Sequence, residues 1–104
     1  MQPHNYVPAP PPLFLDYAGK RYAIQVARFI IGRERGACHL VLVDNNVSRQ
    51  HAAVELVNGV YYMVDLGSRN GVGYDGLRVN RKQIVEGDRF DIGSHQLRFS
   101  FRNP

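Results

Sequence analysis

The chain has 104 residues, the usual size of one domain, and a chain of this length buries about two-thirds of its unfolded surface. Its hydrophobic fraction of 44% and charged fraction of 21% are ordinary for a globular protein, and no apolar run approaches the roughly 18 residues of a membrane-spanning helix. The net charge of +4 favours anionic partners without identifying one.

Residues 1–12 are rich in proline, which favours extended polyproline II and prevents regular pairing in a sheet or helix. We interpret this stretch as a linker or chain end, with a proline-rich ligand for another module as the alternative. The predicted domain is 13–101, and 102–104 form its C-terminal end.

From Leu13 onward the pattern is one of short apolar or alternating runs separated by turn residues. No window of helical length shows a clean period of 3.6 residues. Short strands at spacings of about 8–12 residues predict an all-β sandwich. The predicted strands are 13–17, 22–26, 29–31, 40–43, 52–57, 60–66, 83–85, 89–92 and 96–101.

The clearest hairpin joins 52–57 to 60–66 through Asn58-Gly59. This dipeptide favours a type I′ turn, in which both central residues need a positive φ. Pairing Val57 with Val60 places Val54 and Leu56 on the same face as Tyr61 and Met63, with Glu55 opposite Tyr62 on the other face. The alternation predicts one core face and one mostly wet face.

Three segments that follow or precede strands carry groups suited to an oxyanion: Gly32-Arg33, Ser48-Arg49 and 68–71. Serine donates one O–H, and arginine donates a planar fork of N–H groups that stays charged. Asn70 offers both a donor and an acceptor, which suits a peptide group. We therefore expect these segments to meet at one end of the sandwich and to bind a phosphorylated peptide.

Five motifs in order resemble the forkhead-associated (FHA) domain in kind and spacing, over about residues 13–101. They are Gly32-Arg33, Ser48-Arg49-Gln50-His51-Ala52, Asp65-Leu66-Gly67-Ser68-Arg69-Asn70-Gly71, Gly87-Asp88 and Ile92-Gly93. The resemblance implies an eleven-stranded β-sandwich of two mostly antiparallel sheets. It also implies that loops at one end bind phosphothreonine peptides.

The resemblance assigns roles by position. The phosphate-binding positions are Arg33, Ser48, Arg49 and Arg69, and the peptide-backbone position is Asn70. The positions that set sequence preference are Asn45, Asn46 and Val72, and those that support the site are Gly32, His51, Ser68 and Gly71. Two features depart from the family: Val72 replaces a usual threonine, and the segment 73–80 looks longer than usual.

No catalytic, metal or cofactor site is expected. Ser48 and His51 lack an apparent third, orienting residue, so they are not assigned as a nucleophile pair. Cys38-His39 supplies too few ligands for zinc. Residues 71–76 match G-x-G-x-x-G, but a dinucleotide fingerprint must open a helix and no helical stretch follows.

The predicted function is phosphothreonine-peptide recognition in phosphorylation-dependent protein–protein interactions of signalling or assembly, which implies an upstream Ser/Thr kinase. The module is expected to be a monomer that contacts neither nucleic acid nor membrane. The basic charge and the tyrosines leave a nucleic-acid-binding β module as the alternative. The single cysteine, Cys38, forms no internal disulfide, and the expected location is intracellular, cytoplasmic or nuclear, or the cytoplasmic part of a larger protein.

Overall fold

The computed structural model describes residues 9–103, and this part of the chain folds into eleven β-strands without a helix. The strands are β1 (Leu13–Tyr17), β2 (Lys20–Ile24), β3 (Arg28–Gly32), β4 (Leu40–Val41), β5 (Ala52–Val57), β6 (Val60–Asp65), β7 (Val72–Tyr74), β8 (Leu77–Val79), β9 (Arg81–Gln83), β10 (Arg89–Ile92) and β11 (His95–Ser100). Most of the predicted linker lies outside the described residues, while 9–12 are exposed and have no regular structure. A bilayer-crossing helix is therefore absent from the described stretch.

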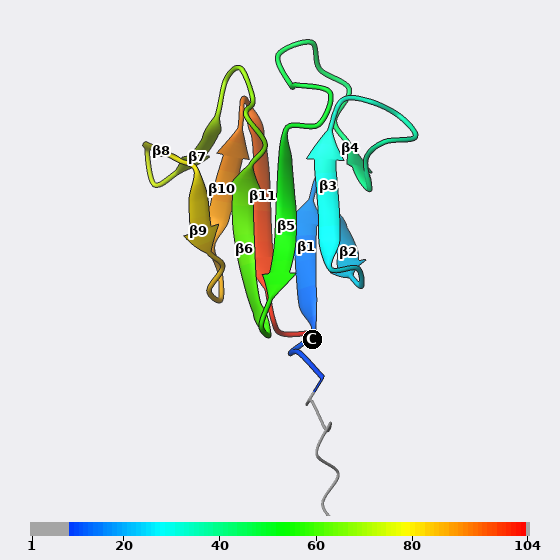
Figure 1. Ribbon diagram of the computed structural model, residues 1–104, viewed down its shortest axis with the longest axis vertical. Helices are drawn as coiled ribbons and strands as arrows, with labels where there is room; N and C mark the ends of the chain where they lie inside the picture. Colours follow the sequence, from blue (N-terminus) through cyan, green and yellow to red (C-terminus); the bar gives the residue numbers. More distant parts are fainter. Residues whose placement is uncertain (1–8, 104) are drawn as a thin grey trace, which may run out of the picture.

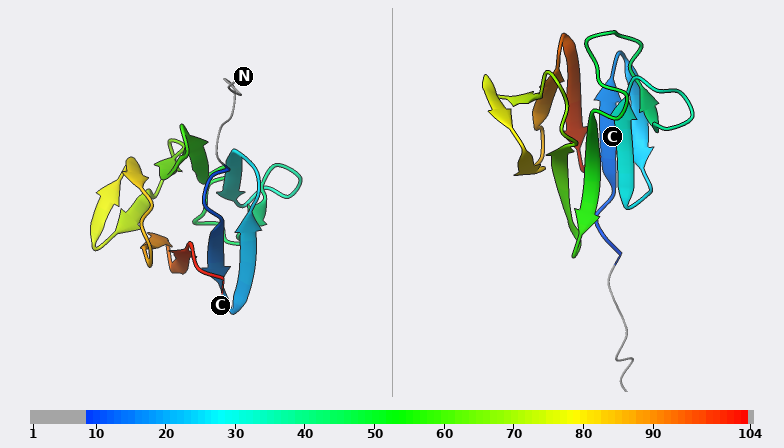
Figure 2. Two further views of the ribbon diagram at one scale, coloured as in Figure 1. Left: turned by 90° about the horizontal axis from the view of Figure 1, so that it is seen from below. Right: turned by 45° about the horizontal axis from the view of Figure 1, so that its top comes forward.

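Two sheets pack face to face (Figures 1 and 2). The six-stranded sheet has the order β2-β1-β11-β10-β7-β8, and the five-stranded sheet has the order β4-β3-β5-β6-β9. All neighbouring strands whose registers are defined run antiparallel, except for the parallel pair β3 and β4. The predicted all-β sandwich of two mostly antiparallel sheets is confirmed.

The core lies between the sheets because alternate residues of each strand point inward. Phe90 and Phe99 meet edge to face at its centre, with ring centroids 5.8 Å apart and an interplanar angle of 75°. The inner faces contribute further buried side chains from both sheets: Leu13, Leu15, Ile92 and Leu97 from one, and Phe29, Ile31, Val54 and Met63 from the other. The two faces bury large apolar side chains, so each sheet is held rigidly by the other.

The β5–β6 hairpin has the predicted turn and register. Asn58 and Gly59 have φ of 52° and 80°, as a type I′ turn requires. Val57 pairs with Val60, and Glu55 pairs with Tyr62 on the outer face. That face is less wet than predicted, since Ala53 on it is fully buried.

Three predicted strands had the wrong bounds. Strand β2 begins and ends two residues earlier than the predicted 22–26, β4 ends two residues before the predicted 43, and β9 covers 81–83 in place of 83–85. The β7–β8 hairpin, within the segment that looked longer than usual, was not predicted. Its turn is Asp75-Gly76, with φ of 53° and 79°, a hairpin dipeptide that also forms part of the G-x-G-x-x-G match.

The loops that carry the predicted anion-binding groups gather at one end of the sandwich. The loops that follow β3, β4 and β6, together with the β10–β11 turn, lie at the top of Figure 1. The start of β1 and the C-terminus lie at the opposite end. The first three loops are the segments that carry the predicted anion-binding groups. The fold thus brings together residues that are far apart in the sequence.

Asp88, in the turn before β10, supports the far end of the fold. Its carboxylate is 5% exposed and accepts hydrogen bonds from Lys82 Nζ at 2.7 Å, Tyr74 Oη at 2.9 Å and the Val85 N–H at 3.0 Å. Burial by itself would raise the pKa of this carboxyl. The three donors outweigh that effect, so the pKa lies below its usual value of 3.8.

We expect Asp88→Asn to lower the free energy of unfolding by about 2–4 kcal/mol at neutral pH, because it breaks a buried pair. The folded pKa is below the unfolded one, so this carboxylate contributes its full stability above the unfolded value. The contribution is lost as pH falls through the folded pKa. Denaturant titrations across the acid range should therefore give a shallower pH dependence for the variant. Asp75→Asn, at an exposed turn position, is the control; equal effects of the two changes would contradict the role of Asp88.

Candidate functional site

His51 connects two of the three loops that carry predicted phosphate-binding residues. It lies just before β5 with no solvent exposure, and its Nδ1 accepts the Ser48 N–H at 3.1 Å. An amide can only donate, so the ring proton is on Nε2, which donates to the Gly71 carbonyl at 2.7 Å. The backbone of His51 also bonds to Ile31 and Leu66. One buried ring therefore fixes the β4–β5 loop against the β6–β7 loop.

The Ser48 side chain lies at the junction of these loops. Its Oγ accepts the Arg69 N–H at 3.1 Å. Since this bond uses an oxygen lone pair, the hydroxyl proton stays available, and no acceptor for it lies among residues 9–103. Ser48 thus presents a donor at the surface while its oxygen is held from behind.

Arg33 is anchored at its base and open at its tip. Its N–H donates to the Ser48 carbonyl at 3.1 Å, and its Nε donates to the Val47 carbonyl at 3.0 Å. Within the described chain the two terminal nitrogens have no hydrogen-bond or ion-pair partner. The planar fork is therefore oriented and still has donors to offer.

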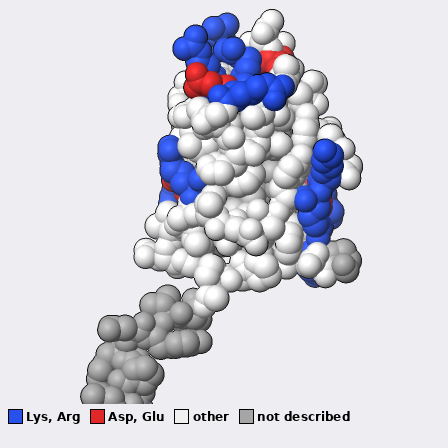
Figure 3. Space-filling model, turned by 90° about the vertical axis from the view of Figure 1, so that its right-hand side faces the viewer, with Lys and Arg blue, Asp and Glu red and all other residues white. Residues whose placement is uncertain are grey.

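These groups surround one small hollow of about 30 Å³ at the loop end. Figure 3 shows basic side chains gathered over this end of the molecule. The hollow is lined by Arg33, Asn45, Asn46, Val47, Ser48 and Arg69. Two arginines and a hydroxyl around one point form a receptor for an oxyanion.

Asn70 joins the rim of the hollow. Its Nδ2 donates to the Asn46 carbonyl at 2.7 Å, so one of the two N–H groups of this amide is used within the protein. The side chains of Asn45, Asn46 and Asn70 are exposed. Asn70 thus links the β6–β7 loop to the residues that line the hollow, and its amide oxygen remains available as an acceptor.

Arg49 differs from the other predicted phosphate ligands, because it does not line the hollow. Its side chain is exposed, and its carbonyl accepts from the Glu34 N–H and from Cys38 Sγ, both at 3.1 Å. Gly32 passes so close that a Cβ there would overlap this carbonyl. Only glycine fits beside Arg49, and this close approach brings the β3–β4 and β4–β5 loops together.

The β6–β7 loop is a tight turn stabilised by three side chains. Ser68 Oγ accepts the Gly71 N–H at 2.9 Å, and Asp65 Oδ1 accepts the Ser68 N–H at 2.9 Å. Arg78, from β8, donates to the Ser68 carbonyl at 3.1 Å. Gly71 has φ of +82°, which a residue with a side chain adopts only with strain.

Asp65 and Arg78, which support this turn, were not among the predicted site residues. Aspartate that bonds a backbone N–H a few residues later is a known turn signal, so Asp65 was recognisable within its motif. Arg78 had no such signal, because it reaches the turn only through the unpredicted β7–β8 hairpin. Val72, which the resemblance assigned to sequence preference, is 1% exposed and belongs to the core. It packs inside the sandwich and offers no surface to a peptide.

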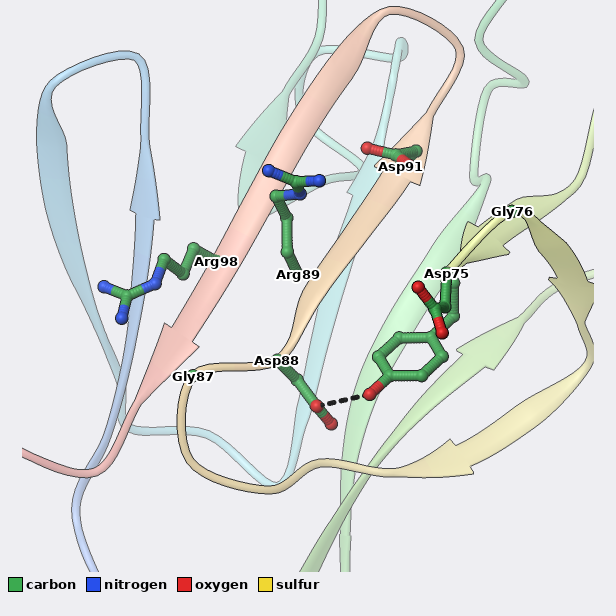
Figure 4. A pocket seen from close by; sticks show the side chains of 8 residues that line it. Asp75, Gly76, Gly87, Asp88, Arg89, Asp91 and Arg98 are labelled. Carbon is green, nitrogen blue, oxygen red and sulfur yellow. Dashed lines mark hydrogen bonds between the residues drawn. The ribbon is translucent and has the colours of Figure 1, made fainter.

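A larger hollow of about 450 Å³ lies on the six-stranded sheet, but its chemistry suits an oxyanion less well. Asp75, Asp88 and Asp91 line it together with Arg89 and Arg98. Figure 4 shows the two guanidinium groups pointing in different directions. Three carboxylates would repel a dianion, and no convergent pair of donors offsets them.

No group of three or more histidine, cysteine, aspartate or glutamate side chains in the described range is placed to hold a metal ion. The oxyanion hollow itself is lined only by neutral and cationic residues. The chemistry at this end is therefore that of hydrogen-bond donors and positive charge.

Comparison with known proteins identifies a family. The family model for the FHA domain matches residues 29–93. A protein phosphatase 1 regulatory inhibitor subunit PPP1R8 homolog of Arabidopsis thaliana is 39% identical over 74 residues, which cover 70% of this chain and 19% of that protein. The glycogen accumulation regulator GarA of Mycobacterium tuberculosis is 34% identical over 82 residues, covering 79% of this chain and 50% of GarA. The chain thus spans half or less of the length of these two relatives.

Two solved structures have a fold similar to that of this chain. EmbR of Mycobacterium tuberculosis, in complex with a low-affinity phosphopeptide, superposes with a TM-score of 0.83 at 30% identity, covering 89% of this chain and 25% of EmbR. A domain solved in a structural and functional analysis of phosphothreonine-dependent FHA domain interactions has a TM-score of 0.79 at 26% identity, covering 89% of this chain and 98% of that one.

We expect His51→Ala to lower the free energy of unfolding by about 2–4 kcal/mol, because it leaves a cavity and two unpaired backbone groups. Ser48→Ala removes one half-buried hydroxyl and should cost less than about 1 kcal/mol. Chemical denaturation of both variants measures the difference. Gln50→Ala, an exposed neighbour, is the control. A greater loss for Ser48→Ala would show that His51 does not hold the loops.

Proposed function

The chain belongs to the FHA family, and on that premise we propose that it is a phosphothreonine-peptide recognition module. Its role would be to bring together proteins in a phosphorylation-dependent way, in signalling or assembly. The observation that carries this proposal is the hollow where Arg33, Ser48 and Arg69 meet. Arg33 directly follows β3, Ser48 lies in the β4–β5 loop, and Arg69 lies in the β6–β7 loop.

The chemistry of the hollow matches a phosphate monoester. A phosphothreonine carries about −1.5 to −2 charges and three acceptor oxygens at neutral pH. Arg33 offers its two terminal nitrogens, and Ser48 offers its hydroxyl proton. Arg69 lines the same hollow and adds a second positive charge. A hollow of about 30 Å³ is small, so we place the phosphate oxygens at its mouth and the peptide outside it.

The peptide would cross the rim of the loops. Asn70 can accept a peptide N–H through its amide oxygen, since its nitrogen is bonded to Asn46. Exposed Asn45 and Asn46 border the same rim and are our candidates for sequence preference. Arg49 lies outside the hollow, so we assign it to the peptide flank. The loops are braced before binding, and docking should therefore be nearly rigid.

The partner would be a protein that carries phosphothreonine made by a Ser/Thr kinase. Curated relatives are named as a regulator and as a regulatory inhibitor subunit, which supports a binding role without catalysis for this domain. We take 13–101 as the binding unit, acting as a monomer in an intracellular setting without cofactor, nucleic acid or membrane contact. A nucleic-acid-binding role is the alternative that the binding assays below distinguish.

We expect Arg33→Ala to weaken phosphopeptide binding by at least about tenfold while the thermal melt stays unchanged. The guanidinium is a charge-assisted donor at a strand end, and its loss leaves no hole in the core. Calorimetric titration with a phosphothreonine peptide from a degenerate library measures the affinity. Arg28→Ala is the control: Arg28 is exposed at the start of β3, the strand that Arg33 follows, and pairs with Glu55 at 3.0 Å. Unchanged affinity for Arg33→Ala would remove this residue from the site.

We expect phosphothreonine to bind about tenfold more tightly than phosphoserine. The additional methyl contributes about 0.8 kcal/mol when buried, and the β-branch restricts χ1 before binding. Aspartate should bind poorly, because one charge and two oxygens cannot satisfy all the donors. Three peptides that differ only at this residue provide the test. Equal affinities for all three, or tighter binding of a single-stranded oligonucleotide, would contradict the proposed function.

The phosphothreonine peptide should bind less tightly as pH falls from about 7 to 5. The second pKa of the phosphate is about 6, and the monoanion attracts the arginines less strongly than the dianion. Titration of the phosphothreonine peptide across this range, with the aspartate peptide as reference, separates this effect from changes in the protein. A flat profile would mean that the dianion is not the bound form.

A further inference from the structure

A row of hydrogen bonds connects the six-stranded sheet to the loop that lines the hollow. Tyr17, at the end of β1, lies with its Oη 2.7 Å from His95 Nδ1. His95, the first residue of β11, lies with its Nε2 2.9 Å from Asp44 Oδ2. Asp44 belongs to the β4–β5 loop, which leads to the five-stranded sheet. The row therefore crosses from one sheet to the other at the binding end.

The chemistry of the side chains determines which atom donates the hydrogen in the bond between His95 and Asp44. An ionised carboxylate only accepts, so His95 Nε2 carries the proton and donates to Asp44. The other oxygen, Asp44 Oδ1, accepts the Asn46 N–H at 2.8 Å. These bonds, from the Asn46 amide and from His95, lower the pKa of the Asp44 carboxyl from its usual value. Both oxygens of Asp44 are thus occupied, one by the histidine and one by its own turn.

The turn that Asp44 holds reaches the hollow directly. The Asp44 carbonyl accepts the Val47 N–H at 3.0 Å, which closes the turn. Asn45, Asn46 and Val47 line the hollow, and the Asn46 carbonyl accepts from Asn70. Asp44 and His95 do not line the hollow themselves. Their side chains are 22% and 17% exposed, so they lie behind its wall.

We propose that His95 is a positioning residue for phosphopeptide binding, which acts from the opposite sheet through Asp44 on the turn at 44–47. The inference rests on the proposed function of the hollow. His51 holds the end of this loop, at Ser48, whereas His95 holds its beginning. The two histidines thus fix the loop from two sides, and neither contacts the phosphate.

The mechanism is preorganisation. Without His95, the Asp44 carboxylate loses its tie to the rigid sheet, its bond to the Asn46 N–H opens more often, and the turn samples other conformations. If only a fraction of molecules has the turn in its binding position, the apparent affinity falls by that fraction. The association rate falls with it, because fewer encounters are productive. The dissociation rate stays the same, because the bound contacts are unchanged.

The test uses three substitutions at one position in the whole chain. His95→Ala removes the ring, His95→Phe keeps its bulk beside Tyr17 without a donor, and His95→Gln keeps a donor for Asp44. Gln96→Ala, an exposed neighbour on β11, is the control. Stopped-flow or surface plasmon resonance measurements with the phosphothreonine peptide give the association and dissociation rates. Chemical denaturation shows whether each variant is folded.

For His95→Ala and His95→Phe we expect the association rate to fall about tenfold with an unchanged dissociation rate, and His95→Gln to restore most of it. Without ligand, hydrogen exchange at the Asn46 amide should be faster in the first two variants alone. Wild-type association rates in His95→Phe, or a change confined to dissociation, would overturn the inference. If His95→Ala fails to fold, the Phe and Gln variants decide between these outcomes.

The ligand-free measurement separates this inference from the proposed function. If the wild-type chain does not bind the phosphothreonine peptide, the proposed function fails, and the role of His95 in binding fails with it. If the wild-type chain binds and the Asn46 amide is equally protected in all variants, the function stands and the positioning role is overturned.

Discussion

The binding end of this protein depends on one buried ring. His51 has no solvent exposure, and each of its nitrogens bonds to the backbone of a different loop. A buried polar group is stable only when its hydrogen bonds are satisfied, so the two loops cannot move apart without leaving a donor and an acceptor unpaired. The constraint holds Ser48 and Gly71 at fixed positions relative to the core.

From that anchor the loops are built mainly of hydrogen bonds to backbone groups. Arg33 is oriented by the Val47 carbonyl, Ser48 receives the Arg69 amide, and Asn70 holds the Asn46 carbonyl. Each bond uses one hydrogen-bonding group of a side chain and leaves another available to a ligand. The loops therefore lose their conformational entropy when the protein folds, and this loss does not weaken ligand binding. The Val47 carbonyl also orients the Arg33 guanidinium without neutralising its charge.

The two sheets contribute differently to the site. The five-stranded sheet carries β3, β5 and β6, whose ends supply the residues that surround the hollow. The six-stranded sheet supplies none of the lining, but it reaches the loop through His95 and the β6–β7 turn through Arg78. Both contacts depend on face-to-face packing of the sheets, so the core that forms between Phe90, Phe99 and Met63 also determines the geometry at the loop end.

The sequence by itself determined the features that depend on local chemistry. Alternation of apolar residues predicted most of the strands, Asn58-Gly59 predicted its turn and register, and the order of motifs predicted the family and the eleven-stranded sandwich. Only the tertiary structure decided which of the predicted residues meet. It placed Arg33, Ser48 and Arg69 around one hollow, left Arg49 outside it and buried Val72. Packing and loop closure determine which segments far apart in the chain lie close together. A short run of residues does not predict either of them. For the same physical reason His95, some 51 residues from Asp44, gave no sign of its role until the two sheets were folded together.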